Sequence, residues 1–219
     1  MLNFELFEKD DEISAYLNIA DKNFAAIGFK EHGLRHAKLS ANIAGNVLKY
    51  LGYSEQEQLL AKISAYAHDI GNAVSANDHS QTGAMIVLDI LQKMEYPYEY
   101  IFPIITAIGT HEDKSTNPIS PVAAALVLAD KTDVHRTRVR VKDEALLDTH
   151  SRVNYACHNA FLRVEKDRKT IALELTIDTN ICPVMDYFEI FLPRTNFCIK
   201  ASAALNCAFE LYINKDKFY

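Results

Sequence analysis

The sequence lacks three features that mark particular classes of protein. It has no excess of positive charge: 23 Lys and Arg against 29 Asp and Glu give a formal net charge of −6, which argues against a general nucleic-acid binder. Its most apolar runs, such as ISPVAAALVLA at 119–129, are far shorter than the about 20 residues that cross a bilayer. The opening MLNFELFEKDDE is acidic and lacks the basic-then-apolar order of a signal peptide. We therefore expect a cytoplasmic protein that does not enter the membrane.

A cysteine motif is also missing. The four cysteines all fall in the second half of the chain and show no CxxC spacing (Cys157, Cys182, Cys198 and Cys207). We expect free, mostly buried thiols in preference to a disulfide framework or a zinc site. With 219 residues, of which 49% are hydrophobic and 24% charged, the chain can form one main domain with a well-packed core and a small appendage.

Glycine and proline are distributed unevenly. All seven glycines lie at or before Gly109, and neither residue type occurs between Pro121 and Pro183. This shift in composition predicts two differently built parts, a helical domain over residues 1–148 and a small α+β unit over residues 149–219.

The first part has the periodicity of helices. Apolar residues recur every four positions at Ile43, Val47 and Leu51, as on the buried face of a helix. Ser54 followed by Glu57 forms a capping box, which predicts the start of the next helix. Few stretches alternate with period two, so we expect an all-helical domain. Further helices are expected near 5–26, 80–93, 98–111 and 120–134.

The second part changes to the period of strands. In TIALELTID (170–178) one apolar side alternates with a more polar side, which predicts a half-buried strand. AFLRVEKDRKT (160–170) predicts its partner and a hairpin turn. Pro183 suits a helix start, Pro193 predicts a kink or break in that helix, and AFELYIN (208–214) alternates again. The unit is therefore predicted to be β-β-α-β, and an exposed edge of its sheet would allow a homodimer or another partner to bind.

Residues of metal-ligating types are spread over the helical part, most near an expected helix end: His32, His36, His68, Asp69, His79, His111, Asp130 and Asp133. Since His68 and Asp69 are about 100° apart on a helix, both reach one ion only from a helix end, and Gly71 would permit such an opening. Asp130 closes an apolar run, where an unpaired carboxylate is costly to bury. Single buried histidines are more often structural than ligating; three have no companions at ligand spacing and are expected to be structural or exposed (His135, His150 and His158).

The order His, His-Asp, Asp on a set of helices resembles the HD superfamily of metal-dependent phosphohydrolases. LRHA around His36, AYAHDIGN around His68-Asp69 and VLADKTD around Asp130 match the local context of that family, over roughly residues 25–140. The resemblance implies a mainly α fold, with an HD-type helical bundle before the small α+β unit. It also implies that His36, His68, Asp69 and Asp130 bind a first metal ion.

Some members of this superfamily bind a second ion through further histidines. NDHSQTGA offers His79, followed by Gly83 as in the HxxxG motif of the family, and AIGTHED offers His111, where Thr110 replaces the first of two adjacent histidines. Imidazole and carboxylate ligands without thiolate suit one or two divalent ions of Mn, Fe, Co, Ni or Zn. With two ions, Asp69 would bridge them. The following EDKSTNP lacks the Gly-Tyr-Pro signature of the branch that cleaves cyclic di-GMP.

The resemblance implies an enzyme that cleaves a phosphoester of a nucleotide or related small molecule with metal-activated water. Lys131 and Arg136 are expected to bind the phosphate, and Glu112 to orient water or protonate a leaving group. The remaining basic residues of DVHRTRVRVK would either extend this positive strip or form solvated salt bridges (Arg138, Arg140 and Lys142). Two alternatives stay open: a nucleotide-sensing regulatory module that keeps the metal site, and a diiron oxygenase or lyase of the same fold.

Overall fold

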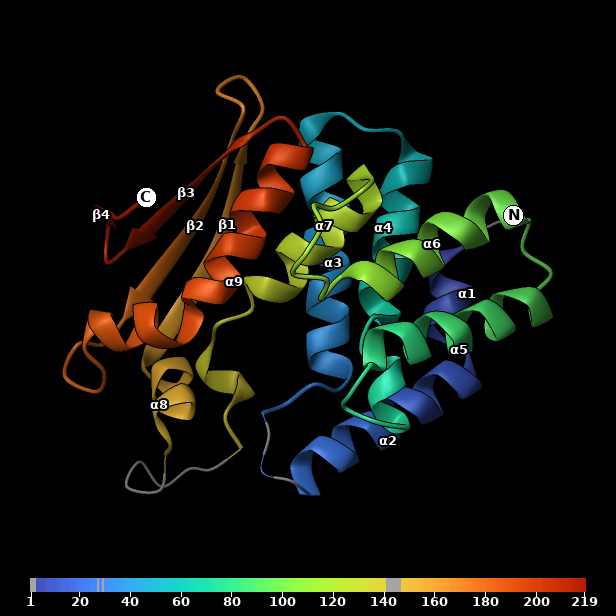
Figure 1. The fold of residues 1–219 in the computed structure, drawn as a ribbon, viewed down its shortest axis with the longest axis horizontal. Coiled ribbons are helices and arrows are strands. Elements are labelled where there is room, and N and C mark those ends of the chain that lie inside the picture. Colours follow the sequence, from blue (N-terminus) through green and yellow to red (C-terminus); the bar gives the residue numbers. More distant parts are fainter. Residues whose placement is uncertain (1–2, 27, 29, 141–146) are drawn as a thin grey trace.

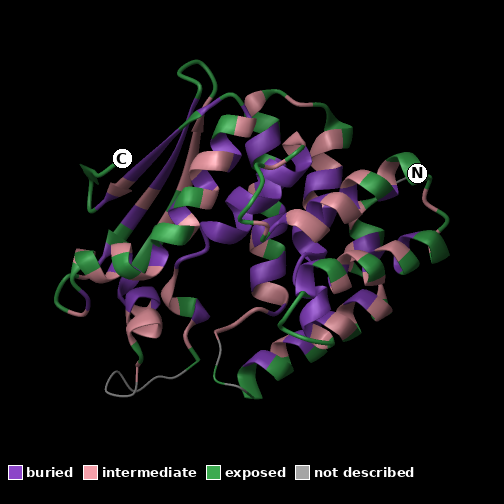
Figure 2. Cartoon of the chain, viewed as in Figure 1, coloured by how far each residue is buried: buried purple, intermediate pink, exposed green. Residues whose placement is uncertain are grey.

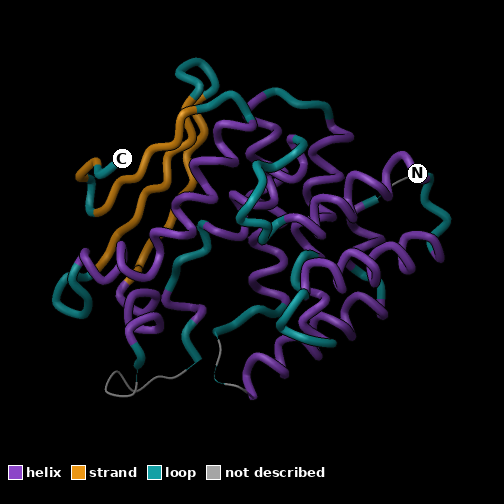
Figure 3. Tube along the Cα trace, in the orientation of Figure 1, coloured by secondary structure: helices purple, strands orange, loops and turns teal. Residues whose placement is uncertain are grey.

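The computed structural model describes residues 3–26, 28, 30–140 and 147–219. A helical bundle carries a small sheet on one flank (Figures 1 and 3), so the expected mainly α fold with a small α+β unit is confirmed. The bundle consists of α1 (Phe4–Glu8), α2 (Asp11–Ala26), α3 (Leu34–Leu51), α4 (Glu55–Ala67), the 3-10 helix η1 (Ile70–Ala73), α5 (His79–Lys93), α6 (Tyr98–Thr110) and α7 (Pro121–Lys131). No helix within these described ranges is long and apolar enough to span a membrane.

Local sequence signals explain where several helices begin. The Ser54 hydroxyl accepts a hydrogen bond from the backbone N–H of Glu57, whose carboxylate accepts one from the Ser54 N–H. The predicted capping box is therefore confirmed. The helix expected over 5–26 is instead divided into α1 and α2, because Asp10 accepts a hydrogen bond from the Ile13 N–H and starts a new helix.

Helix α7 is the centre of the bundle. Every residue from Val122 to Lys131 is buried, and the helix packs against α3, α4, α6 and α9 (Val184–Ala204). Figure 2 shows this buried interior in the middle of the molecule. A helix covered on all sides must be apolar all round, which explains the run PVAAALVLA. It ends at Lys131, short of the expected residue 134, and thereby places two charged side chains inside the core (Asp130 and Lys131).

The C-terminal unit has the predicted β-β-α-β order, with α8 and a short last strand in addition: α8 (Thr149–Ala156), β1 (Cys157–Glu165), β2 (Thr170–Ile177), α9, β3 (Ala208–Ile213) and β4 (Asp216–Lys217). The sheet order is β1-β2-β3-β4; β1 and β2 form an antiparallel hairpin, and β3 lies parallel to β2. The parallel pair requires a crossover, which α9 provides. Pro193 lies inside α9, and the helix is not broken there.

Helix α9 joins the unit to the bundle, because it packs against α7 as well as against β2 and β3. The boundary predicted at residue 148 lies close to residues 141–146, which are outside the described part of the chain. The four cysteines are free and buried, as predicted. Burial raises the pKa of the Cys198 thiol to about 12, so this thiol stays protonated and unreactive at neutral pH.

Gly71 allows the turn after α4 to pack directly on the start of α5. A Cβ atom at this position would lie 2.0 Å from the carbonyl oxygen of His79 and 2.6 Å from the backbone nitrogen of Gly83. These are backbone atoms, which cannot rotate away as the end of a side chain could. The close approach brings the residues after α4 next to His79.

We expect Gly71→Ala to lower the free energy of unfolding by about 3 kcal/mol, because the backbone must move to admit the methyl group. Thermal unfolding followed by circular dichroism measures the effect. Gly109→Ala is the matched control, since its Cβ would meet only the Cβ of Ala84 at 3.5 Å, an ordinary contact. Equal unfolding midpoints for the two variants would contradict the packing argument.

Candidate metal centre

Four buried histidines meet inside the bundle, each at or near a helix end. His36 lies in the first turn of α3, His68 follows the last residue of α4, His79 begins α5 and His111 follows the last residue of α6. The ring centroids are 5.1 Å apart for His36 and His68, 5.1 Å for His68 and His111, and 5.2 Å for His79 and His111. The structure thus brings together the four histidines that were expected to bind metal.

Each of these rings has its Nδ1 atom against a hydrogen-bond acceptor: Asp133 Oδ2 for His36 at 2.7 Å, and the carbonyl oxygens of Ala65 for His68 at 2.8 Å, Ala76 for His79 at 3.2 Å and Ile108 for His111 at 2.6 Å. An imidazole that donates through Nδ1 keeps a lone pair on Nε2 when it is neutral. The Nε2 atoms face each other in two pairs, His36 with His68 and His79 with His111, each at 3.3 Å. Lone pairs in this arrangement repel unless a positive charge lies between them.

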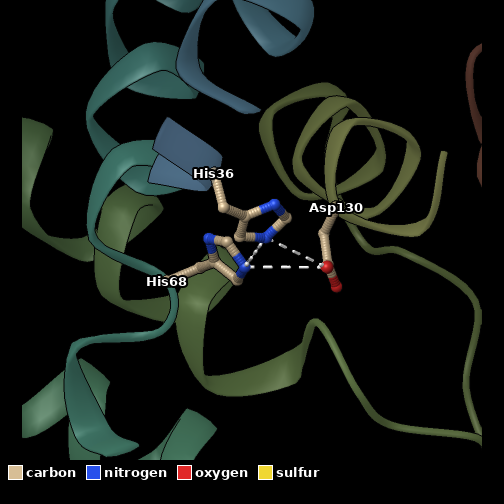
Figure 4. Close-up of side chains that lie close together, drawn as sticks. All are labelled: His36, His68 and Asp130. Carbon is tan, nitrogen blue, oxygen red and sulfur yellow. Dashed lines mark hydrogen bonds and ion pairs between the residues drawn. The ribbon is translucent and has the colours of Figure 1, made fainter. Parts of the chain in front are cut away.

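Asp130 and the first histidine pair form a triangle (Figure 4). Its Oδ1 atom lies 3.6 Å from Nε2 of His36 and 3.7 Å from Nε2 of His68. The point equidistant from these three atoms is about 2 Å from each, which is the length of a bond between a transition metal and nitrogen or oxygen. These residues can therefore hold one ion without rearrangement.

Asp69 lies between the two histidine pairs. Its Oδ2 atom is 3.3 Å from Nε2 of His68 and 3.7 Å from Nε2 of His36, whereas its Oδ1 atom is 3.6 Å from Nε2 of His79. Oδ2 is shielded from solvent and has no hydrogen-bond partner in the described part of the chain. A buried oxygen without a partner is costly, and a metal ion would satisfy it. The two oxygens are thus placed as a bridging carboxylate requires.

The electrostatics of the cluster favour a cation. Burial raises the pKa of both Asp69 and Asp130. The charge of His68 beside Asp69 and the charge of Lys131 beside Asp130 outweigh this effect, so the pKa of each carboxyl lies well below its usual range. Burial lowers the pKa of His68, yet the two carboxylates outweigh it and raise the pKa to about 9. Burial and the charges of His68 and Lys131 lower the pKa of His111 to about 4, so that ring is neutral. The His/Asp groups fit a divalent metal site.

A buried carboxylate, Asp133, orients His36. Its Oδ2 atom is 2.7 Å from Nδ1 of His36 and 2.8 Å from Nη2 of Arg35, and Nη1 of Arg138 lies 3.6 Å away. Burial raises its pKa, but the hydrogen bond from His36 and the charge of Arg138 lower it well below the usual range. Asp133 thus stays ionised and fixes the ring of His36. The sequence identified Asp133 only as a residue of metal-ligating type and did not indicate that it orients His36.

Asn72 supports Asp69 in the same way. Its Nδ2 atom donates to Oδ1 of Asp69 at 3.1 Å and to the Asp69 carbonyl oxygen at 3.0 Å. Asn72 is not a metal-ligating residue type and was not among the residues predicted for the site. Its position one turn after Asp69, in AHDIGN, is the signal that could have identified it.

Lys131 and Glu112 also lie at the cluster. The buried Nζ atom of Lys131 is 2.6 Å from Oδ2 of Asp130 and 2.9 Å from Oε1 of Glu112. Oε2 of Glu112 is 3.9 Å from Nε2 of His79. Burial raises the pKa of Glu112, but Lys131 and His111 outweigh it and lower the pKa, so this carboxylate is ionised at neutral pH.

The remaining basic residues of the expected phosphate-binding strip point elsewhere. Arg136 donates to the Tyr155 carbonyl oxygen at 3.0 and 3.2 Å and stacks on the ring of the same residue. Arg138 is buried against the carbonyl oxygens of Glu31 and Asp133, and Arg140 pairs with Asp21. The short 3-10 helix η2 (Arg136–Arg138) separates these side chains, so they do not form one extended strip. Lys142 lies outside the described residues.

A cavity of about 550 Å³ opens onto the cluster. Asp69, His79, Glu112, Asp130 and Lys131 line it from the bundle, and His32 lines it from the loop before α3. The C-terminal half contributes four more residues: Asp148, His150, Ser151 and Arg194. No motif in the sequence pointed to Arg194. His150 was expected to be structural or exposed, and was therefore not predicted to line the site.

We expect Asp133→Asn to weaken metal binding about 10- to 100-fold. The amide oxygen is an uncharged acceptor, so it holds the His36 ring in place less firmly than the carboxylate does. Competition with a chromophoric chelator measures the dissociation constant. Asp89→Asn removes an exposed carboxylate on α5 and should leave the constant unchanged. The same affinity for both variants would show that Asp133 does not orient the ligand.

Comparison with known proteins agrees with the geometry. Residues 29–134 match the family model described as HD domain. Uncharacterized protein MJ1020 of Methanocaldococcus jannaschii is 27% identical over 192 residues, which cover 77% of this chain and 73% of the relative. The matched segment includes all four histidines and the two aspartates that face them. Residues 29–134 of this chain therefore match the HD domain, which is shared by a superfamily of metal-dependent phosphohydrolases.

Proposed function

We propose that the protein is a metal-dependent phosphohydrolase that cleaves a phosphoester of a nucleotide or related small molecule. The observation that carries the proposal is the convergence of four Nε2 atoms in two pairs with Asp69 between them. In this proposal the metal ligands are His36, His68, Asp69, His79, His111 and Asp130. Two histidine pairs and a bridging carboxylate support two ions rather than one.

Divalent transition metal ions held there would supply a water of lowered pKa and would polarise a phosphoryl oxygen. The residues of the chain have separate tasks. Asn72 holds Asp69 in its bridging orientation. Lys131 presents a buried ammonium group that neutralises charge developing on the phosphoryl oxygens. Glu112, ionised beside Lys131, accepts a hydrogen bond from the attacking water and orients it.

The size of the cavity is consistent with a nucleotide-sized ligand. Its volume of about 550 Å³ falls in the range of small-molecule sites, about 300–1,000 Å³. Phe24 provides an apolar surface in it, and its ring contacts the ring of His32 in a tilted arrangement, with centroids 4.4 Å apart and planes inclined by 42°. An aromatic and apolar wall beside a cluster of metal ligands supports a substrate that combines an organic group with a phosphate.

Metal content tests the binuclear site. We expect about two equivalents of transition metal per chain in the wild type. His68→Ala should remove most of both, because His68 lies against both carboxylates, whereas His79→Ala should retain about one equivalent at His36 and Asp130. Elemental analysis after gel filtration gives the stoichiometry, and Lys200→Ala serves as a surface control. One equivalent in both wild type and His79→Ala would show a mononuclear site. A complete absence of metal binding would overturn the catalytic proposal and leave a binding module.

Substitution at Lys131 tests the phosphate-binding role. We expect Lys131→Gln to lower kcat for a phosphomonoester by about 10²-fold, since a buried donor at the reacting group is lost. Arg136→Gln should lower it far less, because its guanidinium is bonded to Tyr155 outside the cavity. Steady-state kinetics of the metal-loaded variants decide the point. A larger loss of kcat for Arg136→Gln than for Lys131→Gln would favour Arg136 as the phosphate-binding residue, as its position near Asp130 in the sequence predicted.

A further inference from the structure

A second group of polar side chains lines the cavity beyond the metal cluster. Lys30 belongs to the loop before α3, His150 to α8 and Arg194 to α9. Lys30 is 120 positions from His150 in the sequence, and His150 is 44 positions from Arg194, so the bundle and the C-terminal unit must pack together to bring them into one cavity. None of them forms a hydrogen bond or ion pair with the six residues proposed as metal ligands, within the described ranges.

The two basic residues of this group differ in their ion pairs from Lys131, which lies in the same cavity. In the described part of the chain, neither Lys30 nor Arg194 has a carboxylate oxygen within 4.0 Å. Lys131, in the same cavity, pairs with two carboxylates. The nearby acid, Asp148, accepts a hydrogen bond from the Ser151 N–H as the N-cap of α8. Partly buried cations without a partner are unfavourable unless an anion binds them.

His150 and Arg194 are held against the same side chain. The ring of Phe191, buried in α9, lies 5.0 Å from the centroid of the His150 ring and 5.3 Å from Cζ of Arg194. The Nδ1 atom of His150 is shielded from solvent and has no hydrogen-bond partner among the described residues. The His150 ring and the Arg194 guanidinium, which both line the cavity, are thus held by contacts with one buried ring before any ligand arrives, which lowers the entropy lost on binding.

Positive charge is crowded around Lys30. Burial and the charges of Arg194 and Arg138 lower its pKa to about 7, although Asp148 acts in the opposite direction. Arg138 is itself buried. An anion placed among these groups would gain from all of them, and a dianion would gain more than a carboxylate.

We propose that Lys30, His150 and Arg194 form an anion subsite that binds a second phosphate of the substrate, apart from the phosphate that is cleaved at the metal centre. The proposal rests on the proposed phosphohydrolase function and narrows its substrate class to small molecules that carry two separated phosphate groups. It also assigns the C-terminal unit a direct part in substrate recognition.

Calorimetric titration with phosphonates tests the subsite, because phosphonates bind without being hydrolysed. The metal-loaded full chain is titrated with α,ω-alkanediyl bisphosphonates of two to six carbons and with alkylphosphonates of matched length. We expect the best bisphosphonate to bind at least about tenfold more tightly than its monophosphonate, as one or two charge-assisted hydrogen bonds would give. Arg194→Gln and Lys30→Gln should each reduce this ratio of affinities to about two.

Lys200→Gln is the matched control. It removes a cation from the same helix, but the Lys200 ammonium donates to the Lys114 carbonyl oxygen and does not line this cavity, so the ratio should be retained. Equal affinities for both ligand types in the wild type, or an unchanged ratio in Arg194→Gln, would overturn the subsite. If ω-phosphonocarboxylates of the same length bind as tightly as the bisphosphonates, the assignment to phosphate is overturned.

Hydrolysis assays on the same preparations separate the two proposals. Hydrolysis of phosphomonoesters without any advantage for bisphosphonates would overturn the subsite alone. An advantage for bisphosphonates without hydrolysis of any phosphoester would overturn the proposed enzyme and leave an anion-binding site.

Discussion

Repulsion between imidazole lone pairs is the constraint on which the site depends. In each of the four rings the Nδ1 atom is bonded to an acceptor of the chain, so the Nε2 atoms meet as two pairs at 3.3 Å. Packing alone would not select such contacts, because they are unfavourable without a positive charge. A proton can supply that charge, and the two carboxylates accordingly raise the pKa of His68 to about 9. A divalent ion would supply more charge and would satisfy Asp69 Oδ2 as well, so the binding of a metal ion would displace that proton.

The helical fold meets this constraint by ending helices at one place. A residue in the middle of a helix projects in one direction, whereas a residue at its end can be followed by a neighbour that turns toward the same point. His68 and Asp69 use the end of α4 in this way, and Gly71 lets the chain return so closely that His79 at the start of α5 reaches the other oxygen of Asp69. Central helix α7 then brings Asp130 from the opposite side of the core.

The sequence predicted the parts of the structure that depend on local or ordered patterns. Helical spacing, the capping box at Ser54 and strand alternation gave the elements and their order. The order of the ligand-type residues led to His36, His68 and Asp130, which the structure brings together. Contacts between distant segments could not be predicted. Arg136 is close to Asp130 in sequence, but η2 turns it toward Tyr155. Asp133 acts on His36 across 97 positions, and Arg194 enters the cavity only because α9 packs on α7.

The charge of the whole molecule gives a reason for two cationic regions in the cavity. At a formal net charge of −6, the protein repels phosphorylated small molecules at long range. Metal ions at the His/Asp cluster would reverse the sign of the field at one end of the cavity, where the carboxylates otherwise dominate. Lys30 and Arg194, which have no carboxylate oxygen within 4.0 Å among the described residues, add positive charge to the same cavity, and Arg194 depends on the C-terminal unit for its position. A unit without a catalytic motif thus contributes to recognition by bringing a cation to a cavity whose chemistry belongs to the bundle.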